Sequence, residues 1–184
     1  SYSINEYKIM EDKKLLFVCG FMSAGKTTHG KKLARNIGYH FIDLDQYTEK
    51  KYDKSITELF AEVGEDEFRN IETISLNECI NDNQKTVIAL GGGTPCFNNN
   101  IELLKKSGQL IYLKMDAEAL LKRVFGIKAN RPLLANQEEK DMLPYIEELL
   151  QKRAPYYEQS NLTVYHNNLH EDEFKETVLN FIKK

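Results

Sequence analysis

The segment Gly20–Thr27 constrains the fold of this chain more than any other feature. It reads Gly-Phe-Met-Ser-Ala-Gly-Lys-Thr and matches the pattern GxxxxGK[ST]. It lies between the apolar run Leu15–Cys19 and the helix-forming stretch Lys26–Asn36. Glycines permit positive φ angles, so successive backbone N–H groups can point inward beside the positive end of a helix. The segment therefore predicts a strand, a phosphate-binding loop and a helix, with a chance glycine turn as the alternative.

Short apolar runs alternate with helical patterns along the chain. The predicted strands are Leu15–Cys19, Phe41–Leu44, Val87–Leu90, Leu110–Leu113 and Leu162–Tyr165. The predicted helices are Lys26–Asn36, Ser55–Asn81 with a break near Gly64, Ala117–Phe125, Met142–Gln159 and Glu171–Lys183. All strands except Phe41–Leu44 are almost wholly apolar, which favours a parallel sheet covered by helices on both faces. We therefore expect an α/β, three-layer fold with a five-stranded parallel sheet.

Composition and charge narrow the class of partner. The 184 residues are 41% hydrophobic and 29% charged, which suits one folded domain. The net charge of -3 gives no general attraction for nucleic acid, whose binding depends on clustered Lys and Arg. The longest apolar run, Leu15–Cys19, is too short to cross a bilayer. No nucleic-acid or membrane partner is therefore expected.

The cysteines and histidines carry no recognisable site pattern. The cysteines are widely spaced without a CxxC pair, so they predict free thiols, which fit a cytoplasmic protein. The histidines lack metal-ligand or triad spacing, so solvated or structural roles are expected for them. The residues concerned are Cys19, Cys79, Cys96, His29, His40, His166 and His170.

The glycine motif predicts a site for ATP and magnesium. Lys26 would neutralise the β- and γ-phosphates, and the Thr27 hydroxyl would bind Mg²⁺. The residues expected to contact the nucleotide from this loop are Ser23, Ala24, Gly25, Lys26, Thr27 and Thr28.

Two acidic residues lie at the end of the run Phe41–Leu44. Because side chains alternate along a strand, Asp43 and Asp45 are expected to point to the same side, at the sheet edge where α/β proteins bind ligands. One could organise the metal and the other the hydroxyl of an acceptor. The alternative is that Asp45 only caps the next helix.

Six ordered blocks resemble shikimate kinase, a family in the nucleoside-monophosphate-kinase-like branch of P-loop proteins. The blocks are Gly20–Thr28, the Asp43/Asp45 pair, Gly64–Glu72, Leu90–Gly93, Arg131–Leu134 and Lys152–Tyr157. The resemblance runs from about Leu15 to Tyr157. It implies ATP-dependent phosphorylation of the shikimate 3-hydroxyl, with Mg²⁺, on the route to chorismate and the aromatic amino acids.

The resemblance also implies roles for individual residues. Asp43 would hold magnesium through water, and Asp45 would contact the hydroxyl and accept its proton. Arg69 and Arg153 would grip the shikimate carboxylate, with Glu72 orienting Arg69. A solvated surface charge is the alternative for each arginine.

Glycines and aromatic residues would shape the same pocket. Gly92 and Gly93 would allow the backbone to approach the ligand closely, and a simple turn is the alternative. Phe60 and Phe68 would form an apolar wall under the ring, or belong to the ordinary core.

The remaining boundaries follow from composition and from the resemblance. Residues 1–9 are interpreted as a remnant of recombinant expression or a native extension, and 10–184 as a single kinase domain with an acceptor-binding segment at about 46–75. The stretch 126–140 has the composition of a mobile lid. Its Arg131 resembles the lid arginine that reaches the transferred phosphate, so the implied catalytic residues are Asp45, Lys26 and Arg131.

Some positions depart from the family or leave alternatives open. Ser23 stands where the family commonly has glycine, and the adenine pocket is poorly marked, although Arg123 could stack on the base. A gluconate or nucleotide kinase of the same fold and a catalytically silent nucleotide sensor are the competing hypotheses. A monomer is expected because the predicted site lies within one chain.

Overall fold

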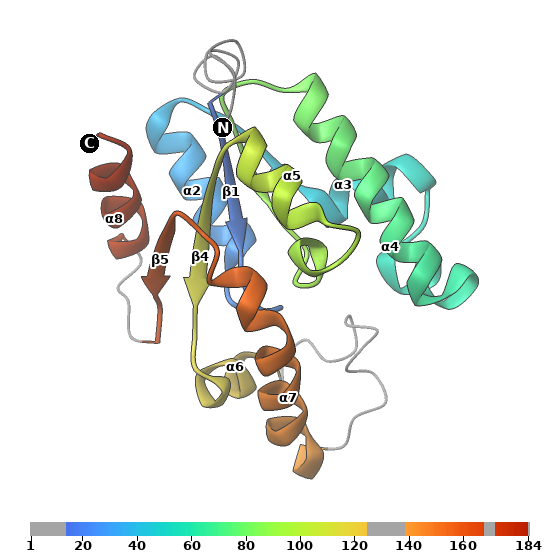
Figure 1. Ribbon diagram of the computed structural model, residues 1–184. Coiled ribbons are helices and arrows are strands. Elements are labelled where there is room, and N and C mark those ends of the chain that lie inside the picture. Colours follow the sequence, from blue (N-terminus) through green and yellow to red (C-terminus); the bar gives the residue numbers. More distant parts are fainter. Residues whose placement is uncertain (1–13, 125–138, 168–171, 184) are drawn as a thin grey trace.

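The computed structural model describes residues 14–124, 139–167 and 172–183, and places a parallel sheet between helical layers (Figure 1). The strands are β1 (Leu15–Cys19), β2 (His40–Asp43), β3 (Thr86–Ala89), β4 (Gln109–Lys114) and β5 (Leu162–Tyr165). They pair in the order β2-β3-β1-β4-β5, and every pair is parallel. The predicted α/β fold with a five-stranded parallel sheet is confirmed.

Helices connect the strands. They are α2 (Lys26–Ile37), α3 (Leu44–Tyr52), α4 (Ile56–Asp82), α5 (Asn100–Ser107), α6 (Ala117–Val124), α7 (Glu139–Tyr157) and α8 (Glu173–Ile182), with a short 3-10 helix, η1 (Thr94–Cys96). Helix α4 begins with a capping box between Ser55 and Glu58 and is interrupted at Gly64, whose φ of 79° and ψ of 173° are not helical. This kink confirms the break predicted at Gly64.

The sheet separates two apolar cores, because neighbouring residues of a strand point to opposite faces. Val18 of β1 packs in a buried cluster that includes Leu33 of α2 and Phe174 of α8. Its neighbour Phe17 belongs to the cluster on the other face, which includes Leu76 of α4. Figure 1 shows α2 and α8 on one side of the sheet and α3, α4 and α5 on the other. The central strands are therefore covered on both faces, as their apolar sequences predict.

Two details of the predicted elements are wrong. The run Leu162–Tyr165 is an edge strand in which Val164 is buried against α8 while Thr163 and Tyr165 are exposed, so it is not covered on both faces. The second predicted strand ends at Asp43, and Leu44 already begins α3. Helices α3 and α5 were not predicted. Helix α3 buries only Leu44 and Thr48, and α5 buries the polar Asn100 beside Ile101 and Leu104, so neither sequence shows a clear repeating apolar pattern.

The strand order brings the carboxyl ends of three strands together. Strands β2, β3 and β1 are adjacent and parallel, so their carboxyl ends meet at one edge of the sheet. Gly20–Gly25 follows β1, Asp43 ends β2 and Gly91–Gly93 follows β3. Helix α7 passes the same edge, at the lower end of the strands in Figure 1. The candidate site is built there.

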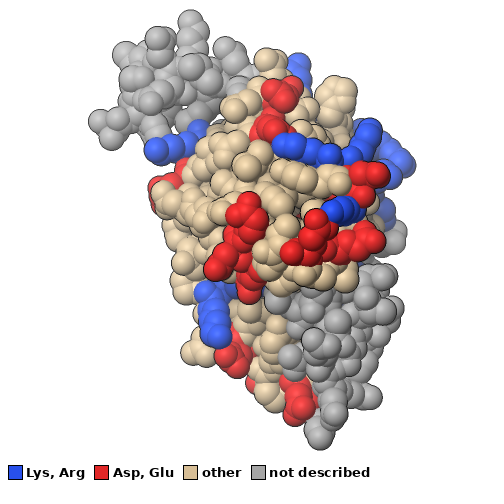
Figure 2. Space-filling model, turned by 90° about the vertical axis from the view of Figure 1, so that its right-hand side faces the viewer, with Lys and Arg blue, Asp and Glu red and all other residues tan. Residues whose placement is uncertain are grey.

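Charges of both signs are mixed on the surface shown in Figure 2, where acidic and basic side chains lie interspersed. An ion pair between Lys51 and Glu78, at 2.5 Å, links α3 to α4. In the described part of the chain, no helix combines the length and the apolar character needed to cross a membrane.

Candidate active site

The loop between β1 and α2 has the backbone shape of a phosphate-binding loop. Gly25 precedes α2 with a φ of 93°, and Ser23 has a φ of 70°. Both values lie in the left-handed region that favours glycine, so Ser23 holds a backbone conformation that is unusual for a residue with a side chain. The ammonium of Lys26 donates to the carbonyl oxygens of Gly20 at 2.7 Å and Phe21 at 2.8 Å. These bonds hold the lysine head within the loop.

A cavity, here called the phosphate-loop cavity, opens beside this loop. Its lining includes Ser23, Gly25, Lys26, Thr27, Thr28, Asp43, Asp45, Gln46, Glu49, Leu90, Gly91, Gly92 and Arg123. All the predicted nucleotide and metal residues of the described chain except Ala24 therefore line one space. Ala24 is buried, but its carbonyl accepts a long contact of 3.5 Å from Arg123.

Asp43 and Asp45 both reach the phosphate-loop cavity, but by a different geometry from the predicted one. Asp43 ends β2 and caps α3, because its Oδ1 accepts the backbone N–H of Gln46 at 3.1 Å. Asp45 lies in the first turn of α3 rather than on the strand. The alternation argument is therefore wrong, and the helix cap is Asp43 rather than Asp45. Because α3 begins directly after β2 with no loop between them, both carboxylates lie at the phosphate-loop cavity.

The Thr27 hydroxyl donates to Oδ2 of Asp43. This contact places one hydroxyl and one carboxylate oxygen next to each other at the phosphate-loop cavity. Magnesium prefers oxygen ligands, takes few of them from protein and keeps several waters. The residues present therefore fit that metal.

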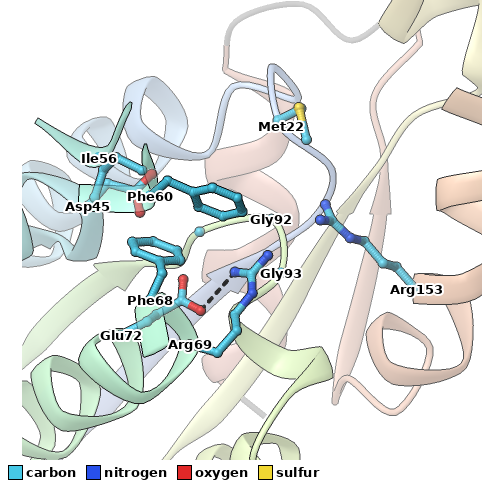
Figure 3. A pocket seen from close by; sticks show the side chains of 11 residues that line it. Met22, Asp45, Ile56, Phe60, Phe68, Arg69, Glu72, Gly92, Gly93 and Arg153 are labelled. Carbon is cyan, nitrogen blue, oxygen red and sulfur yellow. Dashed lines mark hydrogen bonds and ion pairs between the residues drawn. The ribbon is translucent and has the colours of Figure 1, made fainter. Parts of the chain in front are cut away.

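A second cavity, here called the acceptor pocket, adjoins the first (Figure 3). Its lining residues are Met22, Asp45, Ile56, Phe60, Phe68, Arg69, Glu72, Gly91, Gly92, Gly93 and Arg153. Asp45, Gly91 and Gly92 line both cavities, so the two spaces meet at these residues. A ligand in the acceptor pocket would present its near end to the phosphate-loop cavity beside Asp45.

Arg69 enters the acceptor pocket from α4, one turn before Glu72. Its Nη1 donates to Oε1 of Glu72 at 3.0 Å, and Oε2 of Glu72 accepts the Thr94 hydroxyl at 2.8 Å. The guanidinium also lies over the ring of Phe97, 4.2 Å from its centroid. These contacts fix the orientation of Arg69, and Figure 3 shows it facing the pocket.

Arg153 enters the same pocket from α7. Only 6% of Arg69 and 4% of Arg153 is exposed, so the interpretation of either as a solvated surface charge is wrong. Nε of Arg69 and Nη1 of Arg153 are buried and have no hydrogen-bond partner among the described residues. Buried donors are nearly always satisfied. A pocket with two such cationic donors is suited to a planar anion such as a carboxylate.

Gly92 and Gly93 are required by the arginines. A Cβ on Gly92 would lie 2.8 Å from Nη1 of Arg153, and one on Gly93 would lie 2.6 Å from Nη1 of Arg69. The guanidinium groups thus occupy the space that side chains would need. The resemblance predicted close backbone approach at these glycines, and the structure shows that the approaching groups include the two arginines.

Tyr157 supports the glycine segment and was not among the predicted site residues. Its buried hydroxyl donates to the carbonyl oxygen of Gly92. Burial raises the pKa of Tyr157, which keeps the phenol protonated as a donor. The spacing offered a signal, because Tyr157 is four residues after Arg153 and lies on the same face of α7.

Phe60 and Phe68 form an aromatic side of the acceptor pocket. Their ring centroids are 5.2 Å apart, at an angle of 48°. Phe68 also belongs to a small buried cluster with Leu59 and Ile71. Phe68 therefore lines the acceptor pocket and belongs to the core at the same time. Met22, at a variable position of the glycine motif, and Ile56 line the pocket as well, and neither was predicted.

Part of the predicted site lies outside the described residues. This holds for Arg131, for positions 126–138 of the predicted lid and for residues 1–9.

Comparisons with known proteins agree on one family. A sequence model of the family described as shikimate kinase matches residues 22–183. A shikimate kinase from Parabacteroides distasonis is 43% identical over 150 residues, covering 82% of this chain and 86% of the relative.

Solved structures give the same answer. The crystal structure of shikimate kinase from Bacteroides thetaiotaomicron has a TM-score of 0.87 and 34% identity, covering 93% of this chain and 99% of that one. Shikimate kinase from Acinetobacter baumannii in complex with shikimate has a TM-score of 0.86 and 33% identity, covering 96% of each chain. Sequence, architecture and site thus lead to a single conclusion: this chain belongs to the shikimate kinase family.

Proposed function

We propose that this chain transfers the γ-phosphoryl group of ATP to the 3-hydroxyl of shikimate, giving shikimate 3-phosphate and ADP. The observation that carries the proposal is that Nε of Arg69 and Nη1 of Arg153 are buried without a hydrogen-bond partner among the described residues. Both side chains line a pocket that adjoins a phosphate-binding loop. Shikimate is a cyclic hydroxy acid, so its carboxylate suits the arginines and its ring suits the aromatic side of the pocket.

The acceptor would lie between the arginines and Asp45. Carboxylate oxygens would accept from Arg69 and Arg153, while Glu72 keeps Arg69 oriented through its 3.0 Å contact. The ring would rest near Phe60 and the glycine segment Gly91–Gly93. The reacting hydroxyl would then face Asp45, the carboxylate that lines both cavities.

The transfer needs one bond formed and one broken. The acceptor oxygen attacks the γ-phosphorus, the bond from that phosphorus to the bridging oxygen of ADP breaks, and the hydroxyl proton passes to Asp45. Lys26 and Arg131 would stabilise charge on the transferred group, with Arg131 brought from the predicted lid. The backbone of Ser23–Thr28 would hold the phosphates.

Magnesium would be held by Thr27 and, through water, by Asp43. The metal supplies charge neutralisation on the phosphate oxygens. The observed Thr27–Asp43 contact supports this assignment, because the two oxygens lie together beside the loop. We further propose that the enzyme acts as a single-domain monomer in the cytoplasm, feeding the chorismate route to aromatic amino acids.

The competing hypotheses fit the pocket less well. A nucleotide acceptor would need space for a base and an added phosphate, whereas the acceptor pocket offers two buried arginines against a narrow glycine segment. Gluconate carries a carboxylate but no ring to rest on Phe60 and Phe68. A silent sensor would not need Lys26, Asp43 and Asp45 together at one cavity.

A coupled assay of ADP release tests the proposal. Purified protein with ATP and Mg²⁺ would be offered shikimate, quinate, gluconate or a nucleoside monophosphate, and the product would be identified by ³¹P NMR. We expect turnover with shikimate to exceed that with every other acceptor, and one new phosphomonoester in amounts equal to ADP. Preference for gluconate or a nucleotide would replace the proposal, and turnover with none would favour the sensor.

A further inference from the structure

Two of the histidines to which the sequence assigns no function lie together in the fold. His29 belongs to the first turns of α2, and His166 directly follows β5, 137 positions further on. Only 6% of His29 and 8% of His166 is exposed. Their Nε2 atoms are 3.1 Å apart, and the rings meet edge to face with centroids at 4.4 Å. The backbone N–H of His166 is fixed by the carbonyl oxygen of Lys114 at 2.8 Å.

Arg123 of α6 determines which nitrogen of His166 carries the proton. Its Nη1 lies 3.2 Å from Nε2 of His166. A guanidinium can only donate, so Nε2 must present a lone pair and the proton must sit on Nδ1. His29 must then donate from its own Nε2 to the same lone pair. Nδ1 of His166 is buried without a hydrogen-bond partner among the described residues.

The surroundings keep the His166 ring neutral. Burial, and secondly the positive charge of Arg123, lowers the pKa of His166 below its ordinary value. A neutral ring with a free Nε2 lone pair is the form that can accept from Arg123. The buried Phe174 of α8 packs against this pair, with its ring centroid 5.3 Å from that of His29.

Arg123 lies where it can influence the nucleotide. Its Nη1 is 3.5 Å from the carbonyl oxygen of Ala24, and a Cβ on Gly25 would lie 3.5 Å from both terminal nitrogens. Arg123 lines the phosphate-loop cavity and also a neighbouring cavity, which His29, His166 and Asn167 line too. The guanidinium therefore forms part of the wall between the two spaces.

General electrostatics do not hold Arg123 in this place. The neighbouring cavity carries charges of both signs, from Lys32, Lys122, Asp116 and Glu118. Asp116 is already engaged by Tyr165 and Asn167. The contact with Ala24 is long and the contact with Met115 Sδ, at 3.7 Å, is weak. The directional contact to His166 is the shortest hydrogen bond of the Arg123 side chain among the described residues.

We infer that His166, backed by His29, is a positioning residue for nucleotide binding, because its Nε2 lone pair holds Arg123 against the phosphate loop. An arginine held in place beforehand loses less side-chain entropy when ATP binds. The inference rests on the proposed function, since it requires ATP to occupy the phosphate-loop cavity. His166 does not touch the substrate and acts through Arg123.

The first test compares three variants by steady-state kinetics. His166→Phe keeps a planar ring but removes the acceptor, so KM for ATP should rise about three- to tenfold, the size expected for one hydrogen bond. The KM for shikimate should stay unchanged. His166→Asn offers an amide oxygen to Arg123 and should recover part of the ATP affinity. His40→Phe, the same change at an exposed residue of β2, is the matched control and should alter neither constant.

A double-mutant cycle with Arg123→Ala isolates the pair. In that background His166→Phe should change KM for ATP less than about twofold, because the group it positions is already gone. Equal effects in both backgrounds, or an unchanged KM for ATP in His166→Phe, would overturn the inference. Absence of shikimate phosphorylation in the unsubstituted protein would instead defeat the proposed function.

The tautomer supplies a measurement that needs no substitution. Long-range ¹H–¹⁵N spectra of the unsubstituted protein distinguish a protonated from an unprotonated ring nitrogen. If Nε2 of His166 accepts from Arg123, His166 must carry its proton on Nδ1 at neutral pH. A proton on Nε2 would leave His166 without the lone pair that accepts from Arg123. That result would overturn the inference even if the His166→Phe variant failed to fold.

Discussion

Replacing Arg153 with methionine should separate binding from stability. Methionine keeps an unbranched side chain in the pocket and removes the guanidinium, whose Nη1 is buried and has no hydrogen-bond partner in the described part of the chain. A hydrogen bond to a charged group contributes about 1.5–3 kcal/mol. Because about 1.36 kcal/mol corresponds to a factor of ten, KM for shikimate should rise roughly 10- to 150-fold. The KM for ATP should change little, because Arg153 lines the acceptor pocket and not the phosphate-loop cavity.

Stability without ligand should move in the other direction. Only 4% of Arg153 is exposed, and no carboxylate of the described residues lies within ion-pair distance of it. Removing such a charge in favour of an apolar side chain is often neutral or stabilising. The melting temperature of Arg153→Met without shikimate should therefore equal or exceed that of the parent.

The assay is ADP release with each substrate titrated in turn, alongside thermal unfolding. Lys152→Met is the matched control, because Lys152 is the preceding residue, its side chain is 69% exposed and it pairs with Glu148 at 2.8 Å. It should leave both KM values unchanged. If Arg153→Met raised KM for ATP as much as that for shikimate, or left the shikimate KM within twofold of the parent, the proposal that Arg153 binds the shikimate carboxylate would be refuted.

Four further substitutions test other parts of the site. Lys26→Met should lower kcat by roughly two or more orders of magnitude with the fold intact, and near-normal turnover would defeat the phosphate-loop assignment. Gly93→Ala places a Cβ where Arg69 lies and should raise KM for shikimate at least about tenfold with little change in KM for ATP. A KM for shikimate equal to that of the parent would show that Arg69 does not need the space beside Gly93. Asp45→Asn should lower kcat at least roughly a hundredfold at any magnesium concentration. Asp43→Asn keeps the helix cap and should recover part of its activity at high magnesium. If magnesium rescued Asp45→Asn and not Asp43→Asn, the metal-binding and proton-accepting roles of the two residues would be exchanged.

The sequence predicts the local features of this fold well. Apolar runs mark all five strands, and the glycine motif marks the loop between β1 and α2 because its residues act through the local backbone. The strand order β2-β3-β1 could not be predicted from those runs, since pairing depends on contacts between distant segments. Helix α3 was also missed, because only Leu44 and Thr48 of its nine residues are buried and its sequence has no clear apolar repeat.

The site residues were predicted through motifs, and their geometry was not. Gly93 was expected to allow close approach of a ligand. The space beside it is occupied by Arg69 of α4, a residue that lies more than twenty positions earlier in the sequence. Asp45 was placed on a strand and lies on a helix. His29 and His166 carry no motif at all, and only the folded chain brings them within 3.1 Å. Such pairings follow from tertiary packing, which one sequence does not reveal.

The most direct test of the central claim measures binding of two ligands to the same protein. Shikimate and its carboxamide analogue differ in the negative charge that the buried donors of Arg69 and Arg153 are proposed to satisfy. Isothermal titration calorimetry with a non-hydrolysable ATP analogue and Mg²⁺ present should show shikimate binding at least about tenfold more tightly than the carboxamide, since charged hydrogen bonds are stronger than neutral ones. Equal affinities for the two ligands would contradict the account.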